Sequence, residues 1–339
     1  MKLFSTEQVS KYHPDKYADQ ISDAILTECL KQDPHSHVAC ECMVKGTTVV
    51  LGGEITTKAK INYKKIVRRV ASKLGYKAKK IINLIGKQSP EINHAVVREE
   101  NIGAGDQGIM FGYATRETKS YLPAGFDLAN RIIKAIEDDV ENNPLTILKG
   151  DAKTQVTWDY DSDCPELVLV SVCHEKGYTR EQVKEYVMPL LREVYNHNDL
   201  YIINPAGEWT IGGPEADCGL TGRKIVCDQY GGYCPVGGGA FSGKDPSKVD
   251  RSGSYMARQI AIDIVKKFHV KWAEVQLAYM IGEPHPVSVK VKTSRGKDEE
   301  YENWVLENYD LTPAGIIKHL DLLNWDYEKL AEGCHYFKK

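Results

Sequence analysis

Apolar residues spaced three and four positions apart predict the long helices of this chain. The spacing favours helices over residues 21–29, 66–74, 127–140, 249–268 and, more weakly, 299–308. Thr179 followed by Gln182 has the spacing of a capping box and predicts that a further helix begins there. A short helix is also expected after Thr312.

Pairs of strand-forming runs lie between these helices and predict hairpins. The runs are residues 38–44 with 48–55, 154–160 with 166–173, and 273–280 with 287–292. One order therefore recurs three times: a helix, a hairpin and a second helix. Helices layered on hairpin sheets are typical of an α+β fold rather than of a doubly wound parallel sheet.

The recurrence predicts three structurally similar units, which cover residues 1–100, 101–213 and 214–339. These boundaries are approximate, and segments of neighbouring units can interleave. Long glycine-rich connections separate the units, over residues 88–108 and 204–243. Loops of this length inside a compact protein are usually functional or mobile.

Composition narrows the classes of protein that the chain can belong to. With 339 residues, 42% hydrophobic and 27% charged, it is expected to be globular and to contain more than one domain. The formal charge of -3 predicts no nucleic-acid partner and no binding to an anionic membrane. No apolar run reaches the length of a membrane-spanning helix, and a cytoplasmic location is expected. The nine scattered cysteines are interpreted as reduced thiols.

Residues 237–252 form the segment with the strongest chemical signal, GGGAFSGKDPSKVDRS. Three adjacent glycines let backbone N–H groups approach a ligand, and the cations are Lys244, Lys248 and Arg251. Asp245 and Asp250 add candidate metal ligands. The segment lacks the spacing of a Walker loop. It predicts a site for a polyphosphate and a metal ion, and the alternative is a solvated glycine loop.

Two other segments carry related chemistry. His13-Pro14-Asp15-Lys16 precedes the first helix, where Asp15 could hold a divalent cation and His13 or Lys16 could contact phosphate oxygens. The alternative for Asp15 is a simple first-turn charge. Residues 217–224 end in Arg223 and Lys224, which are expected to follow a turn and to open a strand.

Several carboxylates leave two interpretations open. Glu54 follows two glycines at a strand end, and Glu41 lies on the facing strand. Both could bind a ligand or simply face water. Asp151 and Lys153, two positions apart, could form a site or a salt-bridged strand face. Residues 88–91 and 103–108 bracket a loop that is either a lid or an ordinary connector.

These motifs occur together in one order, which resembles the S-adenosylmethionine synthetases, or methionine adenosyltransferases. The motifs are HPDK, GGEIT, GKQSPEIN, GAGDQG, DAK, GGPEADCGLTGRK and GGGAFSGKDPSKVDRS. The resemblance runs from Phe4 to about Leu323, and the last two motifs are the longest.

The resemblance implies transfer of the adenosyl group of ATP to the sulfur of L-methionine. Triphosphate is released and then cleaved to phosphate and diphosphate. A thioether sulfur is already a nucleophile, so no activated serine, cysteine or general base is required. The departing triphosphate requires positive charge, and the resemblance implies two Mg²⁺ ions per site and K⁺ as cofactors.

The resemblance also implies roles for individual residues. The catalytic set is His13, Lys153, Arg223 and Lys244. The ATP-binding set is His13, Asp151, Lys153, Trp209, Asp217, Arg223, Lys224, Ala240, Lys244 and Lys248. The methionine-binding set is Glu54, Gln88, Asp217 and Lys248. Asp15 and Asp250 are the implied Mg²⁺ ligands, and Glu41 is the implied K⁺ ligand.

The implied assembly is a homodimer or homotetramer with active sites between subunits, and the implied fold is three related α+β units around a pseudo-threefold axis. Glu208 stands where the family commonly has a basic residue, and residues 75–86 form a shorter region than usual. Two alternatives therefore stay open. One is a non-catalytic relative that binds nucleotide or pairs with a second synthetase subunit, and the other is a kinase that would yield ADP.

Overall fold

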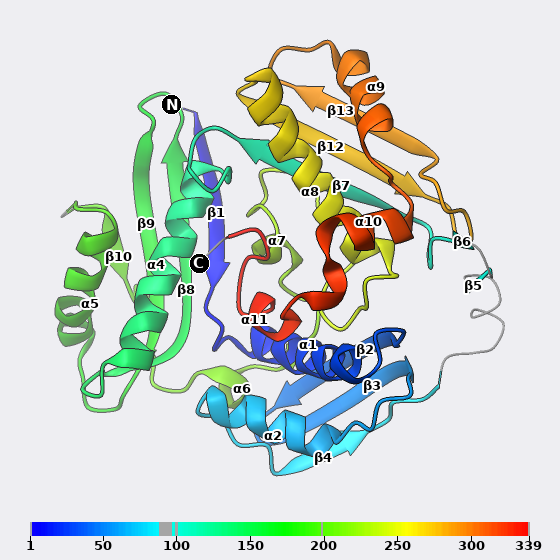
Figure 1. Ribbon diagram of the computed structural model, residues 1–339. Coiled ribbons are helices and arrows are strands. Elements are labelled where there is room, and N and C mark those ends of the chain that lie inside the picture. Colours follow the sequence, from blue (N-terminus) through cyan, green and yellow to red (C-terminus); the bar gives the residue numbers. More distant parts are fainter. Residues whose placement is uncertain (1, 88–96, 99–100, 198, 338–339) are drawn as a thin grey trace.

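The computed structural model describes residues 2–87, 97–98, 101–197 and 199–337. Helices pack against three main sheets built around antiparallel hairpins, which confirms the predicted mixed α+β class. Figure 1 shows these sheets on three sides of the molecule, with the C-terminal segment running between them.

The first sheet contains the hairpin of β2 (His37–Lys45) and β3 (Thr48–Thr56), close to the predicted ranges. β4 (Lys80–Asn83) lies parallel beside β3, and β11 (Gly219–Leu220) lies antiparallel beside β2. Alternate residues of β2, from Val38 to Val44, are buried, so that one face of the strand is covered. α1 (Pro14–Gln32) packs on β2, and α2 (Tyr63–Lys73) packs on α1.

The second sheet has the strand order β1-β8-β9-β10. Its strands are β1 (Leu3–Val9), β8 (Leu148–Asp159), β9 (Cys164–His174) and β10 (Tyr201–Ile203). α4 (Ala124–Asn142) packs on β8 and β1, and α5 (Arg180–Val194) packs on α4. Thr179 and Gln182 form the predicted capping box at the start of α5. This layer has a hydrophobic core of its own.

The third sheet has the order β13-β12-β7, with β7 (Gly108–Thr115), β12 (Trp272–Tyr279) and β13 (Ser288–Thr293). α8 (Val249–Phe268) covers β7 and β12 and has the predicted bounds. A Cβ at Gly112 would lie 2.0 Å from the Ala257 carbonyl carbon, so glycine lets the helix backbone touch the strand. α9 (Asp298–Asn308) packs on β13, and α10 (Pro313–Leu320) packs on α8.

Strands cross between the three stretches of sequence that the hairpins define. β1 pairs with β8, β7 pairs with β12, and β11 pairs with β2. Each main sheet therefore includes a strand from a different stretch of the chain. The boundaries near residues 100 and 213 stay a prediction.

Some strands were not predicted, because their sequences do not alternate between apolar and polar residues. In β1, the buried side chains of Thr6 and Gln8 are polar and bond to the Gly231 carbonyl and to Asn130. The expected strand after Arg223 and Lys224 is wrong. The Asp228 amide bonds to the Lys224 carbonyl and closes a helical turn, α7 (Ile225–Asp228).

Short elements complete the described chain. They are β5 (Val97–Arg98), β6 (Asn101–Ile102), α6 (Gly213–Ala216), the 3₁₀ turn η1 (Leu322–Asn324) and α11 (Tyr327–Leu330). α11 packs on α1. Over the described ranges, no helix is both long and apolar enough to cross a membrane. All nine cysteines are free thiols, as predicted.

Candidate active site

The start of α1 is the first part of the candidate site. His13 is the N-cap residue, Pro14 occupies the first turn, and His13 Nδ1 accepts a hydrogen bond from the Asp15 amide at 3.1 Å. Burial, followed by the charge of Lys224, lowers the pKa of His13 to about 4. The ring is therefore neutral near pH 7, and because Nδ1 accepts, Nε2 carries the proton and can donate to an anionic oxygen.

Asp15 is fully buried beside cations of a distant segment. Its Oδ2 lies 2.5 Å from Lys224 Nζ, and its Oδ1 accepts from the Leu220 amide at 2.9 Å. Arg223 Nε lies 3.7 Å from Oδ1. Burial alone would raise the pKa of Asp15, but the hydrogen bonds from Lys224 and Leu220 lower it. The carboxylate is therefore charged at neutral pH.

In the segment of residues 237–252, residues 237–248 form a loop that leads into α8, and residues 249–252 are the first turn of the helix. Lys244 Nζ lies 2.5 Å from Asp250 Oδ2, and Lys248 Nζ lies 2.5 Å from Asp245 Oδ1. A Cβ at Gly239 would lie 2.4 Å from the Asp250 carboxyl carbon, so the glycine backbone reaches the carboxylate. The segment thus contains two ion pairs next to closely packed glycine backbone.

The two glycine-rich segments, residues 217–224 and 237–252, touch each other. Gly222 has a φ of +76°, and a Cβ there would lie 2.4 Å from the Ala240 Cβ. The segment with Arg223 and Lys224 is thereby placed beside the segment with Lys244 and Lys248.

Two cations that the sequence suggested for phosphate binding are instead committed to ion pairs. Lys16 is fully buried between Asp228, at 2.5 Å, and Asp19, at 3.1 Å. Arg251 is fully buried, and each of its terminal nitrogens bonds to Asp23 at 2.7 Å. The interpretation of Lys16 and Arg251 as phosphate ligands is wrong, because each cation is itself fully buried and paired with a carboxylate.

Asp151 lies at a cavity between β8 and the start of α6. Its Oδ2 accepts from the Gly213 amide at 2.6 Å, and its buried Oδ1 has no hydrogen-bond partner among the described residues. The cavity has a volume of 280 Å³, and Tyr76, Lys149 and Ile211 also line it. Burial raises the pKa of Asp151 to about 6, and the charge of Asp217 adds to the effect against the Gly213 hydrogen bond.

Trp209 precedes Thr210 and Ile211, which line this cavity, but Trp209 itself is not among the lining residues. The indole Nε1 donates to the Ile211 carbonyl at 2.6 Å, and the Trp209 amide donates to His174. Glu208, one residue earlier, is exposed.

Lys153 pairs with a residue other than Asp151. Its Nζ lies 2.8 Å from Glu7 Oε2, and both side chains are partly exposed. The alternative of a salt bridge between Asp151 and Lys153 is therefore wrong, because Lys153 pairs with Glu7 instead. The charge of Lys153 contributes to lowering the pKa of His13, as does the charge of Lys224.

Glu41 and Glu54 lie on the exposed face of the β2–β3 hairpin. Glu54 is opposite Ala39, and Glu41 is opposite Gly52, so the two carboxylates are close diagonal neighbours. Ala39 also forms a backbone bridge to Lys244. The hairpin edge thus brings Glu54 near the loop of residues 237–252, whereas Gln88 lies outside the described residues.

The arrangement fits Mg²⁺ shared between protein and phosphate oxygens. Asp15 and Asp250 offer hard carboxylate oxygens, and each is held by a lysine at 2.5 Å. In the part of the chain that the structure describes, no cluster of three or more His, Cys, Asp or Glu residues gathers. Mg²⁺ commonly takes one or two carboxylates and fills its shell with water and substrate phosphates.

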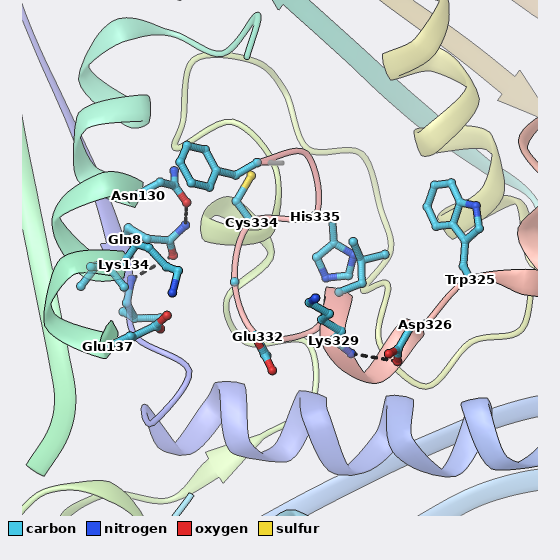
Figure 2. Close-up of a pocket in the computed structure, with 15 residues that line it drawn as sticks. Gln8, Asn130, Lys134, Glu137, Trp325, Asp326, Lys329, Glu332, Cys334 and His335 are labelled. Carbon is cyan, nitrogen blue, oxygen red and sulfur yellow. Dashed lines mark hydrogen bonds between the residues drawn. The ribbon is translucent and has the colours of Figure 1, made fainter. Parts of the chain in front are cut away.

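Another cavity, of 460 Å³, lies between α4 and the C-terminal segment, and Figure 2 shows its lining. None of the predicted site residues lines it. A larger cavity, of 850 Å³, is lined in part by Arg131, Arg258 and Tyr336 and likewise by none of the predicted site residues, so cavity size does not identify the residues that carry the charge chemistry.

Sequence reasoning missed the part that Asp19 and Asp23 play beside the glycine-rich segments. Asp19 Oδ1 accepts from the Gly222 amide, and Asp23 Oδ1 accepts from the Gly243 amide, both at 2.8 Å. The signal that could have found them is their spacing. Asp15, Asp19 and Asp23 recur every four residues on a helix whose other face is apolar.

Comparison with known proteins assigns the class. Sequence models of the three domains of S-adenosylmethionine synthetase match the chain in order: the N-terminal domain at residues 1–97, the central domain at 101–209 and the C-terminal domain at 211–339. The chain therefore belongs to the S-adenosylmethionine synthetase family, whose members are methionine adenosyltransferases, and it is an enzyme of that class.

Two relatives illustrate the likeness along the whole chain. The S-adenosylmethionine synthase of Brachyspira hyodysenteriae is 43% identical over 98% of this chain and 92% of the relative. The S-adenosylmethionine synthase of Wolinella succinogenes is 42% identical over the same shares. The similarity thus covers every segment of the candidate site.

Proposed function

We propose that the protein transfers the adenosyl group of ATP to the sulfur of L-methionine and releases triphosphate, which it then cleaves to phosphate and diphosphate. Family membership supports the reaction class. The observation that carries the mechanism is the pair of buried or half-buried ion pairs, Asp15 with Lys224 and Asp250 with Lys244, each at 2.5 Å.

Sulfur attacks C5′ of ATP in line with the bond to the triphosphate oxygen. The S–C5′ bond forms with the sulfur lone pair, and the electrons of the broken C5′–O bond leave on the triphosphate. Methionine sulfur becomes a sulfonium cation, and no proton moves. The residues therefore act by aligning the two substrates and by stabilising negative charge on the leaving group.

His13, Lys153, Arg223 and Lys244 form the proposed catalytic set. Neutral His13 donates from Nε2 to the bridging oxygen as its charge grows. Lys244 and Arg223 come from the two glycine-rich segments that meet at Gly222 and Ala240. Lysine and arginine side chains fixed around the phosphates stabilise the departing charge without waiting for solvent to reorganise.

Asp15 and Asp250 are the proposed holders of two Mg²⁺ ions, which neutralise phosphate charge when bound. Each carboxylate is now paired with a lysine of the proposed ATP-binding set. Binding of Mg²⁺ and phosphate together offers a cation to the carboxylate and an anion to the lysine. This exchange of partners leaves no buried charge unpaired.

Substrate contacts complete the proposal. ATP is bound by the catalytic set together with Asp151, Trp209, Asp217, Lys224, Ala240 and Lys248. Glu54, Gln88, Asp217 and Lys248 bind methionine, and Glu41 holds K⁺. The proximity of Glu54 to Lys244 through Ala39 supports a methionine site next to the phosphates.

The proposed assembly is a homodimer or homotetramer with the sites between subunits. The exposed side chains of Glu41, Met43 and Glu54 on one face of the β2–β3 hairpin support a partner at that face. We also propose the pseudo-threefold arrangement of three units divided near residues 100 and 213. It is supported by α1, α4 and α8, each of which covers one hairpin-bearing sheet.

Identification of the nucleotide products tests the function. The protein alone is incubated with ATP, L-methionine, Mg²⁺ and K⁺, and the products are separated. S-adenosylmethionine with phosphate and diphosphate is expected. ADP would indicate a kinase instead, and no product would indicate a non-catalytic relative.

A further inference from the structure

Three aspartates of α1 form a regular row beneath the two glycine-rich segments. Asp15, Asp19 and Asp23 are spaced by four residues, lie on one face of the helix and have 0% exposure. Oδ1 of each accepts one backbone amide: Leu220 at 2.9 Å, Gly222 at 2.8 Å and Gly243 at 2.8 Å. One helix face thus holds both segments by their backbone.

The second oxygen of each aspartate faces a cation. Oδ2 lies 2.5 Å from Lys224 for Asp15, 3.1 Å from Lys16 for Asp19, and 2.7 Å from Arg251 for Asp23. Each carboxylate therefore has a counterion, and a hydrogen bond from a backbone amide to an ionised carboxylate is charge-assisted. Burial raises the pKa of Asp19, against the opposing effects of Lys16 and of the Gly222 amide. Lys16 and Arg251, which are fully buried, are the counterions of Asp19 and Asp23.

Asp19 binds the point at which the two segments meet. Asp19 accepts a hydrogen bond from the Gly222 amide, and Gly222 packs so closely on Ala240 that no side chain would fit between them. A shift of Gly222 would change the distance between Arg223 and the loop of residues 237–252.

Asp23 and Arg251 together hold the backbone on both sides of the Gly243–Lys244 peptide bond. Asp23 accepts from the Gly243 amide, and Arg251 Nη1 donates to the Lys244 carbonyl at 3.1 Å. Gly243 has a φ of +82°, and a Cβ there would lie 1.9 Å from the Cys40 carbonyl oxygen. β2, α1 and the Asp23–Arg251 ion pair thereby fix the backbone position of Lys244.

We propose that Asp19 and Asp23 are positioning residues of the adenosyl transfer, which set the spacing of the phosphate-binding cations through backbone amides. This inference rests on the proposed function, because it assigns the purpose of the cations to triphosphate. The energetic argument is preorganisation: cations held in place before binding lose little freedom when the anion arrives.

The competing interpretation is that Asp19 and Asp23 only stabilise the fold. Matched control variants separate the two. Asp228 is equally buried and shares Lys16 with Asp19, but within the described chain its side chain makes no hydrogen bond to residues 217–224 or 237–252. The Tyr255 hydroxyl accepts from the Arg251 Nε side-chain donor and makes no hydrogen bond to the backbone of either segment in the described residues. Asp228→Ala and Tyr255→Phe therefore perturb the same buried network while leaving the backbone contacts.

The test measures binding of tripolyphosphate with Mg²⁺ by calorimetry, together with thermal midpoints and kcat and KM for ATP. Asp19→Ala and Asp23→Ala are expected to bind tripolyphosphate roughly 10- to 100-fold more weakly than the wild type, the range for losing one charge-assisted hydrogen bond. Asp228→Ala and Tyr255→Phe are expected to stay within about threefold of the wild type. Equal affinities in Asp19→Ala and Asp228→Ala, at a temperature where both are folded, would overturn the inference.

Rescue provides a second readout that a role in stability alone would not produce. Asp19→Asn keeps a neutral acceptor for the Gly222 amide and is expected to recover part of the affinity lost in Asp19→Ala, even though it does not restore the charge facing Lys16. If Asp23→Ala does not fold, Arg251→Lys replaces it. That variant keeps a charge for Asp23 but loses the donor to the Lys244 carbonyl, so weaker tripolyphosphate binding is expected and unchanged binding contradicts the inference. A wild-type protein that makes no S-adenosylmethionine overturns the proposed function instead, whichever way these affinities fall.

Discussion

Lys244 Nζ and Asp250 Oδ2 lie 2.5 Å apart at the entrance to α8. The lysine is proposed to meet the departing triphosphate and the aspartate to hold Mg²⁺. Their contact means that each proposed ligand group is kept in place, and its charge compensated, before substrate arrives. The same relationship recurs between Lys224 and Asp15.

Replacement of Lys244 by alanine is expected to slow the reaction while leaving the fold intact. The cation meets charge that develops mainly in the transition state, so kcat should fall roughly 10²- to 10³-fold with a smaller change in KM. Steady-state kinetics and a thermal melt provide the measurement. Lys290→Ala is the control, because Lys290 lies on β13, pairs with Glu302 of α9 and should leave kcat unchanged when replaced. An unaltered kcat in Lys244→Ala would refute the role.

Asp15 is expected to contribute to the pH dependence of the free energy of unfolding at acidic pH. Its pKa is lowered in the folded protein, so it contributes stability above its ordinary pKa of about 3.9, and that contribution is lost as the pH falls through the lower folded value. Lys224→Met removes the hydrogen bond that lowers this pKa and leaves burial to raise it. The variant should lose about 3 kcal/mol at pH 7 and regain part of it as the pH falls and Asp15 is protonated.

Urea unfolding of both proteins between pH 3 and 7 measures this difference. Lys329→Met, at an exposed lysine of α11, serves as the control and should follow the wild-type curve. Parallel curves for Lys224→Met and the wild type would argue against the pairing of Asp15 with Lys224.

His13 is expected to act as a neutral donor. Because its pKa is lowered to about 4, it should contribute no ionisation to the pH profile of kcat/KM between pH 6 and 8. His13→Asn retains an N-cap side chain, so the thermal midpoint should hold while kcat falls roughly 100-fold. An ionisation near pH 6.5 in the wild-type profile that disappears in His13→Asn would contradict the neutral state.

Asp151 should make the KM for ATP depend on pH. Its raised pKa, about 6, means that the carboxylate takes up a proton as the pH falls through that value, with no loss of folding stability from this group. KM for ATP is therefore expected to rise below pH 6 in the wild type. In Asp151→Asn it should be high and independent of pH over that range. The same pH dependence in both proteins would remove Asp151 from the ATP site.

The helices and hairpins could be predicted from the sequence because their apolar residues follow one period. α8 has the predicted bounds, and the β2–β3 hairpin differs by a residue or so at its ends. β1 could not be predicted in this way, because its buried positions include Thr6 and Gln8, whose polar groups find partners far along the chain.

The residues of the candidate site could be predicted from the sequence, but the ion pairs between them could not. The motifs contain lysines and arginines that look alike in sequence, yet Lys224 is partly exposed while it pairs with buried Asp15, whereas Arg251 is fully buried against Asp23. Whether a cation can still reach a ligand depends on carboxylates more than 200 residues away in the sequence, because the fold decides which side chains lie next to one another.

A single-turnover reaction tests the central claim most directly. Excess protein is mixed with ATP labelled on the γ-phosphate, L-methionine and Mg²⁺, quenched at successive times, and assayed for nucleotide and phosphate products. The account predicts that S-adenosylmethionine and intact triphosphate form together in equal amounts, before phosphate and diphosphate accumulate. Release of labelled phosphate or of ADP before any S-adenosylmethionine would contradict the proposal that triphosphate is the leaving group.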